Sequence, residues 1–225
     1  MASLPDLLDA GGVEPGVRDR LTRYGRLVLE TNRSLNLTGA KTEDDLAPHL
    51  LDSLSLLPFL GTDLIDVGSG AGFPAIPLAI ASGRPITMVE TTQKKALFLR
   101  RMLEELDLEG EVVNERAEVA GHIERLRDRF ATGTARAVGS GPTVIELLLP
   151  FLATGGLALL QRGKLDDAER AAMSDAAPML AAAVEAESLI EGDRRILFVR
   201  KLGATPQRFP RRSGVPAQRP LCLEG

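Results

Sequence analysis

The sequence predicts an α/β fold with a seven-stranded, mostly parallel sheet that follows a helical segment of about 60 residues. From residue 63 onward, short apolar runs of strand length alternate with helical patterns. Such alternation implies parallel strands joined by right-handed crossovers. The last two apolar runs are separated by only four residues, 191–194, which is too short for a crossover. We therefore expect the sheet to end in an antiparallel hairpin.

The first part of the chain is predicted to form two helices that pack on the sheet. One is expected around 17–28, where apolar residues recur at steps of four, three and four. The second is expected over 44–57, and the polar stretch 32–42 predicts a break between them. The residues predicted to face inward are Val17, Leu21, Tyr24, Val28, Leu46, Leu50, Leu54 and Leu57.

The sheet region divides into short strands and one well-marked helix. A single apolar stripe of Ala96, Leu99, Leu103 and Leu106 predicts a helix over 92–108. We expect a helical extension at 1–60, a sheet domain at 61–202 and a basic C-terminal tail at 203–225. The predicted strands are 63–67, 86–90, 111–114, 134–138, 157–161, 186–190 and 195–200.

Composition is that of a globular protein, with 44% apolar and 26% charged residues. The N-terminus lacks the basic and apolar regions of a signal peptide, and no apolar run approaches the roughly 20 residues of a bilayer span. The single Cys222 excludes an internal disulfide, and no zinc-ligand spacing is present. These features favour a cytoplasmic protein without a metal site.

Charge is unevenly distributed, although the net charge is −4. After Asp193 the next acidic residue is Glu224, and eight arginines and lysines lie between them. Because phosphate attraction depends on the local field, this segment is a candidate for nucleic-acid contact. A solvated tail is the alternative.

The sharpest motif is the glycine loop Gly68-Ser69-Gly70-Ala71-Gly72, between a predicted strand and a predicted helix. Its glycines permit a tight turn and let a ligand lie against bare backbone at a helix N-terminus. Glu90 ends the next strand, where a carboxylate can accept hydrogen bonds from both hydroxyls of a ribose. The pair indicates an adenosine-containing cofactor, either NAD or S-adenosylmethionine.

Three further observations favour S-adenosylmethionine over NAD. The glycine spacing is G-x-G-x-G and not the dinucleotide G-x-G-x-x-G. Asp66, two residues before Gly68, is placed to meet a positively charged methionine group. The terminal hairpin is typical of class I methyltransferases, a Rossmann-like fold class. The sequence therefore predicts such an enzyme.

Several motifs in a fixed order resemble one family over about 21–221. The chain resembles the bacterial RsmG (GidB) methyltransferases, which methylate N-7 of a guanine in the 530 loop of 16S ribosomal RNA. The resemblance implies S-adenosylmethionine as cofactor and 16S rRNA or the 30S subunit as partner. The matching motifs are Asn36-Leu37-Thr38, His49 to Leu54, Asp66 to Pro77, Lys94-Lys95, Phe98-Leu99, Arg116-Ala117-Glu118, Arg136-Ala137-Val138 and Phe209 to Gly214.

The resemblance also implies a set of site residues. No general base is expected, because guanine N-7 has no proton to lose. His49, Asn36 and Asp52 are open between a role in the site and local capping or bracing. The chain departs from the family at Ala75, at 139–141 and at 161–164. The residues implied to bind the cofactor are Gly68, Gly70, Phe73, Glu90, Ala117, Glu118 and Arg136.

Two other functions fit the same fold. One is a methyltransferase acting on a small molecule or a protein, for which a basic tail is superfluous. The other is a non-catalytic RNA-binding module, which the intact glycine loop and Glu90 disfavour.

Overall fold

A computed structural model describes residues 2–136, 138–163, 165–191 and 194–223. Four positions in predicted strands, motifs or the hairpin turn lie outside the described residues. They are Ala137, Lys164, Gly192 and Asp193. One sheet has the order β3-β2-β1-β4-β5-β7-β6. Its strands are β1 Leu64–Val67, β2 Ile86–Val89, β3 Gly110–Val113, β4 Phe130–Ala135, β5 Leu152–Arg162, β6 Ala182–Glu191 and β7 Arg194–Lys201.

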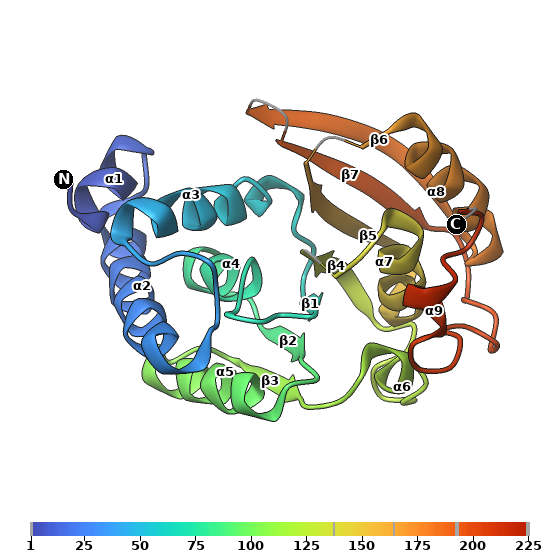
Figure 1. Ribbon diagram of the computed structural model, residues 1–225, viewed down its shortest axis with the longest axis horizontal. Coiled ribbons are helices and arrows are strands. Elements are labelled where there is room, and N and C mark those ends of the chain that lie inside the picture. Colours follow the sequence, from blue (N-terminus) through green and yellow to red (C-terminus); the bar gives the residue numbers. More distant parts are fainter. Residues whose placement is uncertain (1, 137, 164, 192–193, 224–225) are drawn as a thin grey trace.

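The predicted sheet architecture is confirmed. The first five strands pair in parallel, and β7 runs antiparallel to both β5 and β6. Helices cover both faces of the sheet (Figure 1). They are α1 Leu4–Ala10, α2 Pro15–Leu35, α3 Glu43–Leu54, α4 Ala75–Ser82, α5 Gln93–Glu105, α6 Ala117–Ala120, α7 Gly141–Leu148, α8 Asp167–Met179 and α9 Val215–Gln218, with short 3-10 turns η1 Leu57–Phe59 and η2 Leu149–Phe151.

Some predicted boundaries are wrong. Strand β4 occupies Phe130–Ala135 and not 134–138. The prediction is wrong because the buried centre of the strand, Thr132 to Thr134, has too low a hydropathy to mark a buried strand in the sequence. Helix α2 continues to Leu35, into the expected break, and ends at Asn36 in a left-handed conformation. This geometry supports the capping interpretation of Asn36.

The core consists of two apolar clusters on opposite faces of the sheet. In Figure 1, α1 to α4 lie left of the sheet and α6 to α9 lie right of it. Leu21, Tyr24 and Leu50 of the N-terminal helices are fully buried with Ile76 of α4 and Leu99 of α5. The N-terminal helices therefore build one of the two layers. In the part of the chain that the structure describes, no helix has both the length and the apolar character needed to cross a bilayer.

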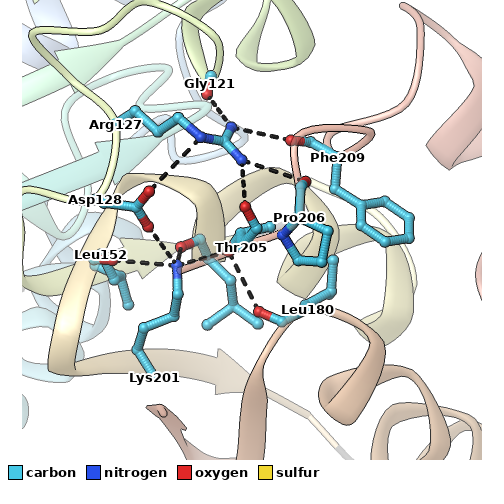
Figure 2. Close-up of polar contacts among 10 residues, drawn as sticks. Gly121, Arg127, Asp128, Leu152, Leu180, Lys201, Thr205, Pro206 and Phe209 are labelled. Carbon is cyan, nitrogen blue, oxygen red and sulfur yellow. Dashed lines mark hydrogen bonds and ion pairs between the residues drawn. The ribbon is translucent and has the colours of Figure 1, made fainter. Parts of the chain in front are cut away.

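The segment after β7 is tied to the domain by two cations (Figure 2). The Arg127 guanidinium donates to the carbonyl oxygens of Gly121, Thr205, Pro206 and Phe209 at 2.6–3.3 Å. The fully buried Lys201 donates through Nζ to Asp128, Leu149, Leu152 and Thr205. These contacts satisfy buried groups and fix the path of the chain.

Arg211 has a structural partner inside the domain. Its guanidinium and its backbone N–H donate to the Glu146 carboxylate, which is completely buried in α7. The expected basic tail is therefore docked at this residue. Arg208, Arg212 and Arg219 are exposed.

Candidate active site

The glycine loop joins β1 to α4 at the carboxyl edge of the sheet. Gly68, Gly70 and Gly72 have φ values of 72°, 57° and 98°, a region that side chains with a Cβ disfavour. The backbone N–H groups of Gly68 and Ser69 donate to the carbonyl oxygen of Val89, which ends β2. The loop thus lies over the ends of β1 and β2, the place where open α/β sheets bind nucleotides.

Glu90 lies beside this loop. Its Oε2 accepts a hydrogen bond from Gly70 N at 2.9 Å, and its Oε1 accepts one from Thr92 N at 2.7 Å. Only 7% of the residue is exposed. Because each carboxylate oxygen has a second lone pair, the group is still able to accept ribose hydroxyls.

Asp66 supplies a second acid under the loop. It is fully buried; Oδ1 accepts from Thr134 Oγ1 at 2.7 Å, and Oδ2 has no hydrogen-bond partner among the described residues. Burial raises the pKa of this carboxyl to about 7. A cationic group from a ligand would satisfy Oδ2, so Asp66 fits the methionine ammonium of S-adenosylmethionine.

Phe73 joins the loop to a group of polar side chains. The Arg136 guanidinium carbon lies 4.9 Å from the centre of the Phe73 ring, and the His49 ring centre lies 5.9 Å from it. Arg136 is the first residue after β4, not part of an apolar strand, and its Nη1 is 3.8 Å from Asp52 Oδ2. Burial, reinforced by Arg136, lowers the pKa of His49. Its imidazole is therefore neutral near pH 7.

A pocket of about 740 Å³ opens next to this group. Four of its lining residues are arginines, and Asp52 is the single acid among the lining residues that the structure describes. The wall combines the ends of β4, β5 and β7 with α3 and the loop before it. The lining residues are Thr38, Gly39, Pro48, His49, Asp52, Arg136, Gln161, Arg162, Gly163, Arg194 and Arg195.

Ala117 and Glu118 begin the short helix α6 after β3. Ala117 is nearly buried, and Glu118 Oε1 accepts a hydrogen bond at 2.8 Å from Gly214 N of the C-terminal segment. Ala117, Gly68, Glu90 and Arg136 thus follow the carboxyl ends of β3, β1, β2 and β4. The structure gathers the predicted set along one sheet edge, and the individual cofactor contacts stay predictions.

Several residues around the pocket have roles that the sequence does not predict. Asn32 organises its rim: the side-chain amide donates to the carbonyl oxygens of Thr38 and Ala40 and accepts from the N–H groups of Leu37 and Thr38. A lone asparagine near a helix end carries no signal for this. In the sequence, Gln161 and Arg162 stand out only as departures from the family motif.

The sheet order, the terminal hairpin, the glycine loop and the two buried acids define a class I S-adenosylmethionine-dependent methyltransferase. The chain resembles the solved structure of an O-methyltransferase from Bacillus cereus in complex with SAH, with a TM-score of 0.57 over 80% of this chain and 91% of that one. Sequence identity is 17%, so this likeness concerns the fold. Among the described residues, no cluster of three or more His, Cys, Asp or Glu could hold a metal ion.

Sequence comparison gives the family. The family model GidB, described as rRNA small subunit methyltransferase G, matches residues 18–197. Proteins named Ribosomal RNA small subunit methyltransferase G are 39% identical in Pelotomaculum thermopropionicum, over 98% of this chain and all of that protein, and 40% identical in Deinococcus deserti, over 96% of each. The chain belongs to the rRNA small subunit methyltransferase G family and is an S-adenosylmethionine-dependent methyltransferase.

Proposed function

We propose that the chain methylates N-7 of a guanine in the 530 loop of 16S rRNA, within the small ribosomal subunit of the cytoplasm. The observation that carries this proposal is the arginine-lined pocket beside the glycine loop. The names of the relatives and the motif resemblance support the same substrate.

The residues present fit the cofactor. S-adenosylmethionine, when bound, supplies an electrophilic methyl group on a sulfonium sulfur. The backbone of Gly68 and Gly70 would lie against it, Glu90 would accept its ribose hydroxyls, and Asp66 would meet its ammonium. Phe73, Ala117, Glu118 and Arg136 remain the other proposed contacts along the same edge of the sheet.

The reaction requires the protein to align N-7 with the methyl group and does not require it to transfer a proton. The N-7 lone pair forms the new bond to the methyl carbon, and the carbon–sulfur bond breaks with its electrons going to sulfur. The positive charge moves to the guanine ring, and no proton leaves. Correct positioning can lower such a barrier by several kcal/mol, roughly 7–11 in the best intramolecular cases. We therefore assign no general base, and the neutral His49 has a bracing role.

The pocket explains how a protein of net charge −4 attracts RNA. Arg136, Arg162, Arg194 and Arg195 gather at one place, although ion pairs with Asp52, Glu169 and Glu187 offset part of their charge. Local fields of this kind steer phosphates independently of the total charge. Because the single tyrosine, Tyr24, is buried, the site offers little aromatic surface for stacking, and phosphate contacts and RNA shape should dominate recognition.

The decisive experiment is methyl transfer from labelled S-adenosylmethionine to 30S subunits that lack the modification, compared with protein-free 16S rRNA. We expect label in 16S rRNA, at one guanine that becomes sensitive to borohydride and aniline cleavage in the 530 loop. Label at another position or in a ribosomal protein would refute the proposal. Absence of transfer by the folded, cofactor-binding protein would favour a non-catalytic RNA-binding module.

A further inference from the structure

Two buried oxygen atoms in the wall of the arginine-lined pocket lack hydrogen-bond donors. Asp52 Oδ1 and Gln161 Oε1 have no such partner among the described residues. The two residues are neighbours, because Gln161 Nε2 donates to the backbone carbonyl oxygen of Asp52 at 2.6 Å. Both residues line the same pocket, and their buried acceptors lie close behind its surface.

The arginines around Asp52 do not supply the missing hydrogen bonds. Arg136 Nη1 lies 3.8 Å from Oδ2 and Arg194 Nη1 lies 3.7 Å from Oδ1, which are ion-pair distances beyond hydrogen-bond range. Burial raises the pKa of Asp52, which reflects the cost of keeping its charge there. A buried acceptor without a donor is costly, so a wall with two of them is suited to a ligand that brings N–H groups.

We propose that Asp52, assisted by Gln161, reads the Watson–Crick edge of the target guanine. This proposal rests on the function proposed above. Guanine presents N1–H and the N2 amino group on that edge, whereas adenine presents the N1 lone pair, which a carboxylate repels. In the purine ring N-7 lies on the opposite edge. A base held at its Watson–Crick edge by Asp52 therefore leaves N-7 free to face the methyl group.

The same contact favours the transition state. As the methyl group transfers, the guanine ring becomes positively charged, and its N1–H becomes a stronger hydrogen-bond donor. The hydrogen bond to the Asp52 carboxylate is then stronger in the transition state than in the ground state, which is the condition for rate acceleration. Asp52 thus both selects the base and speeds its reaction.

The alternative is that Asp52 acts only by orienting Arg136. A change of the target base distinguishes this role from base recognition. We compare 30S subunits reconstituted with ligated 16S rRNA that carries guanine or inosine at the target position. Inosine lacks the N2 amino group but keeps N1–H and N-7. The measured quantity is the single-turnover methylation rate with saturating cofactor, for the wild-type protein and for Asp52→Asn.

We expect inosine to slow the wild-type protein about tenfold or more, as for the loss of a hydrogen bond to a charged group. In Asp52→Asn, the rate on guanine should fall about 10- to 100-fold, and the guanine-to-inosine ratio should shrink to about threefold or less. Any intrinsic difference in N-7 reactivity is present in both enzymes and cancels. If both substrates slow equally, so that the ratio is unchanged, Asp52 acts only through Arg136 and the proposal is wrong.

The matched control is Asp44→Asn, which removes the same charge from an exposed position of the same helix. It should leave rates and ratio unchanged. Calorimetry should show unaltered S-adenosylmethionine affinity for Asp52→Asn. If that variant does not fold, Gln161→Met tests the same wall and should reduce the ratio by a smaller factor; an unchanged ratio there also overturns the proposal. A wild-type protein that makes no N-7-methylguanine defeats the proposed function itself, which is a different result.

Discussion

Burying a carboxylate without a cation works against folding, and Asp66 pays this cost beneath the glycine loop. The folded protein keeps the proton on Asp66 up to about pH 7, whereas the unfolded chain releases it near the usual pKa of 3.8. Its contribution to stability is therefore most favourable below pH 3.8 and is lost as the pH rises toward 7.

We predict that Asp66→Asn gains stability relative to the wild type as the pH rises. Between pH 5 and pH 8, without cofactor, the difference in unfolding free energy should shift by about 2–3 kcal/mol in favour of the variant. Urea unfolding at both pH values measures it, and comparing two pH values cancels any constant packing effect. A pH-independent difference would mean that the Asp66 pKa is ordinary.

Glu90 should determine cofactor affinity. Glu90→Ala removes the proposed acceptor for both ribose hydroxyls and the acceptor for Gly70 N, so affinity should fall about tenfold to a hundredfold. Calorimetry with S-adenosylmethionine measures this loss. Glu104→Ala, which removes an acid from an exposed position of α5, is the control. Unchanged affinity in a folded Glu90→Ala variant would place Glu90 outside the site.

His49 should not act as a base. Because its pKa lies below the usual 6.5 and N-7 has no proton, the single-turnover rate with both substrates saturating should stay nearly flat from about pH 6 to 8. A tenfold fall per pH unit on acidification, abolished in His49→Gln, would contradict this. That result would point to a substrate atom that must lose a proton.

At the scale of elements, the sequence predicts those structural features that depend on residues close together in the chain. The glycine loop, Glu90 and the terminal hairpin follow from residues close in the chain, and the structure confirms their placement. Strand β4 lies earlier than its hydropathy predicts, because its buried positions hold threonine and glycine. The pocket was not predicted because it combines α3, β4, β5 and β7, whose meeting depends on packing.

Two of the three departures from the family motif, at 139–141 and at 161–164, illustrate this dependence because they contact each other. Arg162 Nη1 donates to the Gly139 carbonyl oxygen at 2.6 Å, and Glu169 Oε1 accepts from both Arg162 Nη2 and Gly141 N at 2.5 Å. The loop before α7 is thus held by β5 and α8. Val138 of this loop lies beside Gly68, where a Cβ would come within 2.7 Å of it.

We predict that Glu169→Ala releases this loop and lowers stability by about 1–3 kcal/mol, since it leaves a partly buried arginine and an N–H group without an acceptor. Urea unfolding measures the change. Asp167→Ala is the matched control, because Asp167 is an exposed acid in the same first turn of α8 and loses the same helix-dipole interaction. Equal effects of the two variants would show that the loop contact contributes nothing.

At the scale of the whole molecule, the C-terminal segment is part of the domain and not a free basic arm. Arg127 and Lys201 hold its first residues, and Arg211 binds the buried Glu146. In the sequence, Arg211 and its neighbour Arg212 look like equivalent basic residues. The fold shows that Arg211 pairs with Glu146, an acid 65 residues earlier in the chain. The arginines of this segment that are open to RNA are therefore the exposed Arg208, Arg212 and Arg219.

Arg211 and Arg212 should consequently give opposite phenotypes. Arg211→Ala leaves the Glu146 carboxylate buried without its cation, so we expect a loss of about 3–5 kcal/mol in unfolding free energy. Arg212→Ala should change stability by less than about 0.5 kcal/mol, because the residue is exposed. It should instead weaken 30S binding and reduce the salt-dependence slope by up to about one unit. Urea unfolding and salt-titrated binding measure the two effects. If Arg211→Ala keeps full stability and loses RNA affinity, Arg211 is an RNA ligand and its pairing with Glu146 does not hold the tail.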